Sequence, residues 1–87
     1  MKNATVLPSQ PVALSVEQIR ELNEKLTTLR HDLNNSLSLM AASAEMIRRR
    51  PASADQMWKT FQEQPRKITE AMAQFSRDVE AALQIIR

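Results

Sequence analysis

The single histidine of the 87-residue chain, His31, is followed directly by Asp32 and, one helical turn later, by Asn35. A neutral imidazole is a nucleophile near neutral pH. Residues four apart share a face of a helix, so Asn35 lies beside the imidazole if this stretch is helical. A carboxylate and a hydrogen-bonding amide around the only imidazole predict nucleophilic chemistry at His31.

The plain alternative is that His31 is an ordinary surface residue on a helix. Two adjacent asparagines, Asn34 and Asn35, argue against this alternative, because asparagine is a mediocre helix former and packing does not require it here.

The composition excludes several kinds of site. Glycine is absent, which removes the glycine-rich loops that hold nucleotide phosphates. Cysteine is absent and histidine occurs once, so we expect no metal and no cofactor. The net charge is only +2, basic and acidic residues are interleaved, and aromatic residues make up 3% of the chain, so we expect no nucleic-acid partner. A self-sufficient nucleotide-using enzyme is excluded, and whether the chain is part of an enzyme stays open.

The first 14 residues carry Pro8 and Pro11, which suit neither a helix nor a sheet interior, and predict an extended or disordered lead. They contain no apolar core of signal-peptide length, and the apolar runs of the chain are far too short to span a bilayer. We therefore expect a cytoplasmic location and no membrane partner.

The rest of the chain, residues 15–87, predicts one helical domain. Ser15 with Gln18 fits a capping box, so a first helix is expected from about 16 to 50, ended by Pro51. Ser53 with Gln56 has the same spacing.

A second helix is therefore expected from about 54 to 86, with a kink or short break near Pro65, which has no N–H to donate. The connection between the helices is so short that they must be antiparallel neighbours.

Both helices carry apolar residues at heptad spacing. In the first helix Ser36 and Ser43 occupy part of one apolar line, and in the second Pro65 interrupts another. A lone hairpin leaves half of each apolar stripe in water, and so small a chain needs a partner to cover it. The predicted fold is therefore all-α: an antiparallel two-helix hairpin that dimerises into a four-helix bundle. The residues expected in the shared core are Leu26, Leu29, Leu33, Ile68, Phe75 and Val79.

At about 100° per residue, His31 lies opposite the apolar residues of its helix, among polar neighbours. It is therefore predicted to face water. Those neighbours are Glu24, Thr27, Thr28, Asn34, Asn35 and Ser38.

The stretch Arg30-His31-Asp32-Leu33-Asn34-Asn35-Ser36-Leu37 resembles the phosphoacceptor box of bacterial sensor histidine kinases, in which an acid follows the histidine and Thr or Asn stands three residues later. The resemblance covers residues 19–50, and the second helix matches only in length and apolar spacing. It implies a dimeric helical hairpin with the histidine on its outer face.

The resemblance also implies a role for each candidate catalytic residue. His31 accepts a phosphoryl group from a kinase or a receiver aspartyl phosphate, Asp32 orients the ring and takes its other proton, and Asn35 holds a water for dephosphorylating a receiver. The implied partners are a second copy of the chain and a response-regulator receiver domain, a histidine kinase, or both.

The chain departs from the family pattern in two ways: Ser36 stands where many members have proline, and the ATP-binding domain is missing. Monomeric histidine phosphotransfer domains share His31, Leu33 and Ser36, but their Lys-Gly pair is replaced by Asn34 and Asn35, which favours the dimeric type. The alternative function is a non-catalytic helical adaptor that binds signalling partners. The intact set of His31, Asp32 and Asn35 separates the two, because scaffolding alone does not need it.

Overall fold

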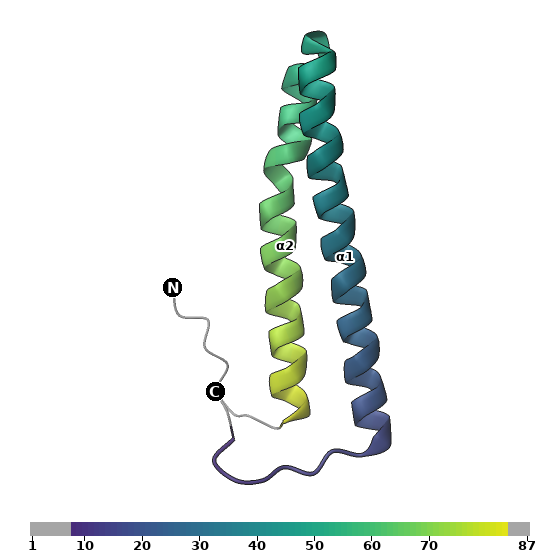
Figure 1. Cartoon of the computed structure of the whole chain (residues 1–87). Coiled ribbons are helices and arrows are strands. Elements are labelled where there is room, and N and C mark those ends of the chain that lie inside the picture. The colour runs from purple at the N-terminus through teal and green to yellow at the C-terminus, as the bar shows by residue number, and fades with distance from the viewer. Residues whose placement is uncertain (1–7, 84–87) are drawn as a thin grey trace.

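The structure, a computed structural model, describes residues 8–83; residues 1–7 and 84–87 lie outside that description. It contains two long helices, α1 (Val16–Arg49) and α2 (Ala54–Ala82), joined by a 3₁₀ turn, η1 (Pro51–Ser53). The helices run antiparallel (Figure 1), which confirms the all-α hairpin. Residues 8–14 of the predicted lead form neither helix nor strand, whereas its first seven residues and the predicted helical residues 84–86 fall outside the described part.

The start of α1 is fixed by the predicted capping box. The hydroxyl oxygen of Ser15 accepts from the Gln18 N–H at 3.1 Å, and the Gln18 side-chain oxygen accepts from the Ser15 N–H at 2.8 Å. The end of α1 carries cations that suit the negative end of the helix dipole. Arg48 and Arg49 both form ion pairs with the same carboxylate oxygen, Oε2 of Glu45. The distances are 2.6 Å from Nη2 of Arg48 and 2.5 Å from Nε of Arg49.

The second capping box does not form, and this prediction is wrong. Ser53 makes no side-chain hydrogen bond to the start of α2, and its ψ is 4°, whereas the ψ of Ser15 is 163°. A capping serine needs extended backbone to turn its oxygen toward the helix start. The 3₁₀ turn at Pro51 instead curls the chain straight into α2, and the Ser53 N–H donates to the Arg50 carbonyl at 2.9 Å.

The helix α2 continues through Pro65, so the helix does not break at this residue. Pro65 has no N–H, and the carbonyl of Phe61 therefore loses its usual helical donor. A bend at Pro65 stays a prediction.

The hairpin is a single layer of helices, and the chain as a whole measures 57 × 28 × 12 Å. Its thickness is that of one helix, so both long sides of the layer face solvent. Within residues 8–83 no apolar side chain is buried, and the buried residues are Ser36, Ser43 and Gln64. The apolar residues predicted for a shared core are half-buried, except Leu26, which is exposed.

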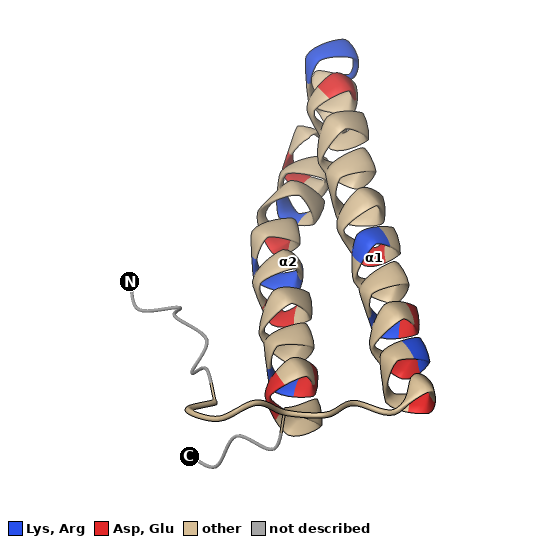
Figure 2. Ribbon diagram, turned by 60° about the horizontal axis from the view of Figure 1, so that its bottom comes forward, with Lys and Arg blue, Asp and Glu red and all other residues tan. Residues whose placement is uncertain are grey.

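The two helices lie closer together near η1 than near the chain ends (Figures 1 and 2). Residues 22, 29, 36 and 43 form one heptad line of α1, and this line changes from leucine to serine toward η1. Small side chains allow the helix axes to approach, whereas Leu22 and Leu29 hold them apart. The serines that interrupt the apolar line therefore mark the closest helix contact.

Candidate functional site

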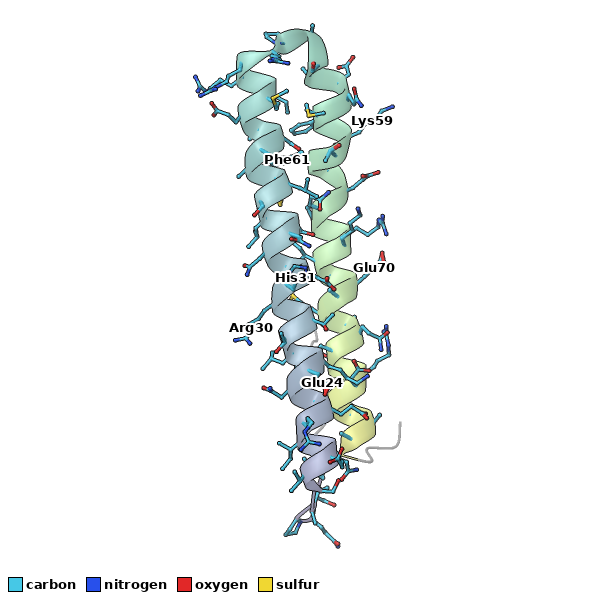
Figure 3. All side chains as sticks on the ribbon, turned by 90° about the vertical axis from the view of Figure 1, so that its right-hand side faces the viewer. Glu24, Arg30, His31, Lys59, Phe61 and Glu70 are labelled. Atoms are coloured by element: carbon cyan, nitrogen blue, oxygen red, sulfur yellow. The ribbon has the colours of Figure 1, made fainter. Side chains whose placement is uncertain are left out.

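His31 lies in the middle of α1 with its side chain exposed to solvent. The buried Ser36 is five residues further on, which places it about 140° around the helix from His31. Figure 3 shows His31 about midway along α1, with Glu24 nearer the start of that helix. The imidazole is therefore directed away from α2, and its neighbours Thr27, Thr28, Asn34 and Ser38 are also exposed.

Asn35 is the residue that contacts the imidazole. Its side-chain nitrogen, Nδ2, lies 3.4 Å from Nε2 of His31. An amide nitrogen only donates, so this weak contact is a hydrogen bond in the neutral ring form that carries its proton on Nδ1 and leaves Nε2 as the acceptor. In that form the lone pair of Nε2 is the nucleophilic position of the ring. The Asn35 amide must turn aside before the lone pair attacks, and it then lies next to the attached group.

The Asp32 carboxylate is not hydrogen-bonded to the imidazole, although the role implied by the resemblance is to orient that ring. In the described part of the chain no hydrogen bond joins its carboxylate to the imidazole, because consecutive helical residues point about 100° apart. Asp32 instead lines a shallow groove between the helices, together with Asn35 of α1 and Lys67 and Ala71 of α2. Asn35 contacts both the ring and this groove, whereas Asp32 lines the groove and makes no hydrogen bond to the ring. We call this face, with His31, Asp32, Asn35 and Lys67, the histidine side.

The opposite long side exposes large apolar residues of both helices. Counted at about 100° per residue from Ser36 in α1 and Gln64 in α2, these residues lie at rotations of about +80° to +120° on each helix. Because the helices are antiparallel, the same sense of rotation leads to the same side of the hairpin. We call it the apolar side; its exposed members are Ile19, Leu26, Leu37, Trp58 and Met72.

The rings of Trp58 and Phe61 are stacked at the η1 end of α2, with centroids 5.4 Å apart and planes 7° from parallel. Trp58 remains 50% exposed in this arrangement. The stacking holds a large apolar surface at one end of the apolar side.

The heptad and motif patterns of the sequence do not single out two residues that the structure places at the grooves and the helix contact, Gln64 and Leu39. Gln64 is only 1% exposed, and the signal for it is its place in the heptad line that includes Met57 and Ala71. Leu39 is 45% exposed on the histidine side, where the other exposed residues around His31 are polar. The sequence indicates the exposure of Leu39 because this leucine falls outside both apolar lines of the first helix.

The charges on the hairpin are interleaved along both helices (Figure 2). Lys25 of α1 and Asp78 of α2 form an ion pair between the helices at 3.8 Å, next to a second groove that Asp32 also lines. Within residues 8–83 no three potential ligands among His, Cys, Asp and Glu gather to hold a metal ion. Neither helix among residues 8–83 combines the length and the hydrophobicity that a bilayer-spanning segment needs.

The chain matches no protein-family model, no curated protein and no solved structure. Two observations remain to indicate a function: the arrangement of the site, and the resemblance of residues 30–37 to a phosphoacceptor box.

Proposed function

We propose that the chain is a phosphoacceptor and phosphotransfer module of two-component signalling, in which His31 accepts a phosphoryl group and passes it on. The observation that carries this proposal is the placement of His31. The ring is exposed, it is directed away from α2, and the side-chain nitrogen of Asn35 lies 3.4 Å from its Nε2. A partner protein can reach such a ring without any rearrangement of the hairpin.

The transfer step uses the form of the His31 ring that carries its proton on Nδ1 and has a lone pair on Nε2. The lone pair of His31 Nε2 forms the N–P bond while the P–O bond of the donor breaks, and the leaving oxygen keeps the electron pair. The product imidazole is cationic until Nδ1 releases its proton. Asp32 is the nearest carboxylate in sequence and takes this proton either directly, after a change of side-chain rotamer, or through a water molecule.

The phosphoryl donor belongs to another domain or another protein. This chain has no glycine and therefore no loop that could hold the phosphates of ATP. The chemistry of His31 fits two donors, a histidine kinase that holds ATP and a receiver domain that carries an aspartyl phosphate. In the reverse direction, a receiver aspartate is the acceptor.

A second copy of the chain is the proposed occupant of the apolar side. Two hairpins placed with these sides together form a four-helix bundle, in which Leu26, Leu29 and Leu33 meet Ile68, Phe75 and Val79 in one core. Since the described hairpin buries no apolar side chain by itself, this association supplies the core that it lacks. The histidine sides remain on the outside of the bundle.

The test is incubation of the full chain with radiolabelled phosphorylated receivers and with histidine kinases supplied with ATP. We expect label on the chain that is lost in mild acid and kept in alkali, because a phosphoramidate behaves this way and a serine phosphate behaves in the opposite way. The variant His31→Ala should take up no label, and its helicity and dimer mass should be unchanged, because an exposed side chain carries little packing energy.

Two further variants separate the roles of the neighbours. Asp32→Asn should slow phosphoryl transfer, and Asn35→Ala should spare transfer but reduce dephosphorylation of a receiver. If kinases and receivers bind the chain yet leave His31 unlabelled, the phosphoacceptor proposal is wrong and the non-catalytic adaptor is the correct function.

A further inference from the structure

Gln64 is the most deeply buried residue described in the hairpin, and half of its amide has no partner. Its Nε2 donates to the Thr60 carbonyl at 2.8 Å. Its Oε1 is buried and accepts no hydrogen bond. A buried acceptor without a donor costs free energy that opening of the surrounding structure recovers, because water then supplies the donor.

The next residue, Pro65, weakens the same turn of α2 in a second way. Proline has no N–H, so the Phe61 carbonyl loses its helical donor. Residues 60–65 therefore contain one missing backbone hydrogen bond and one unpartnered side-chain oxygen. Both features lower the cost of opening α2 at this turn relative to the rest of the helix.

The packing across from this turn is polar and small. Gln64 lines the same groove as Asp32, Asn35 and Ser36 of α1, so it lies across from the turn that follows His31. The α1 residue buried at this level is Ser36, whereas the same heptad line carries Leu22 and Leu29 farther from η1, so less hydrophobic stabilisation opposes a separation of the helices here.

We propose that Gln64 and Pro65 form a hinge in α2, at which the helix opens more readily than in its C-terminal half, directly across from the α1 turn that carries Asp32 and Asn35. Opening at this hinge changes the α2 wall of the groove and leaves both ends of the hairpin in place. The hinge depends on the hairpin alone and is independent of phosphorylation at His31.

Native-state hydrogen exchange on the full chain tests the hinge. We expect the amides of residues 62–69 to exchange about tenfold faster than those of residues 71–77, because opening costs less there. Residues 71–77 lie nearer to the C-terminal end of α2, so fraying of that end alone would make them exchange faster than residues 62–69. Equal or slower exchange of residues 62–69 would overturn the proposal.

Two variants test the two causes separately. Gln64→Leu keeps the size of the side chain and removes the unpartnered oxygen, and it should slow exchange of residues 62–69 by about tenfold. Its matched control is Gln62→Leu, an exposed position on the same helix, which should leave this exchange unchanged. Pro65→Ala returns a donor to the Phe61 carbonyl and should slow exchange of the same segment. If both Gln64→Leu and Pro65→Ala leave the exchange unchanged or speed it, there is no hinge at this turn.

Discussion

One long side of the hairpin exposes Leu26 of α1 with Trp58 and Met72 of α2, whereas the other exposes His31, Asp32 and Asn35 of α1. The apolar side offers contact area without a reactive group. The histidine side offers a nucleophile and polar neighbours with little apolar area. A hairpin only one helix thick can therefore carry a contact surface on one side and a reactive side chain on the other, because each helix turns a different face to each side.

A charge placed on the apolar side should have the largest effect. Leu33→Asp puts a carboxylate into the proposed shared core, where an unpaired charge costs several kcal/mol, on the order of 3–5. We expect the variant to be monomeric, unfolded or both, as measured by light scattering and circular dichroism. Asn34→Asp adds the same charge one residue later, at an exposed position, and should change neither mass nor helicity. The same mass and helicity for Leu33→Asp and Asn34→Asp would contradict the assignment of the apolar side as the contact surface.

Two exposed leucines allow a direct comparison of the sides. Leu26 on the apolar side is 37% exposed, and Leu39 on the histidine side is 45% exposed. Leu26→Gln should weaken the dimer by about 1.5–3 kcal/mol, since apolar area that a second copy would cover is lost. Leu39→Gln should leave dimer dissociation unchanged, as measured by sedimentation equilibrium. A weaker dimer for Leu39→Gln alone would mean that the histidine side is the contact surface.

The smallest effect concerns the start of α1, which sets the rotation of both faces along that helix. Ser15→Ala removes the oxygen that accepts from Gln18, and should cost about 1 kcal/mol of the free energy of unfolding. Ser53→Ala is the control, because Ser53 makes no capping bond, and it should cost much less in thermal or urea unfolding. A larger loss at Ser53 than at Ser15 would contradict the observed caps.

The sequence predicts the local features of the hairpin well. The Ser15–Gln18 capping box involves two residues three apart, and the side-chain pattern alone specifies it. The Ser53–Gln56 pair has the same spacing but does not cap. The 3₁₀ turn at Pro51 holds the backbone of Ser53 in a conformation from which its hydroxyl makes no capping hydrogen bond. The outward direction of His31 follows from helix periodicity and is seen in the structure.

Features that depend on both helices are harder to predict. The burial of Gln64 depends on how α2 is rotated against α1, which heptad spacing fixes only to within about one position. The same rotation places Asp32 in the groove with Lys67 and leaves Asn35 to contact the imidazole. The roles of His31, Asp32 and Asn35 in phosphoryl transfer stay predictions.

The mass of the chain in solution tests the separation of the two sides most directly. The protomer has a mass of 9.9 kDa. Light scattering at micromolar concentration should give twice this mass, because we propose that a second copy covers the apolar side of each hairpin. A monomer mass together with full helicity would contradict the account, since the hairpin would then be stable with its apolar side in water.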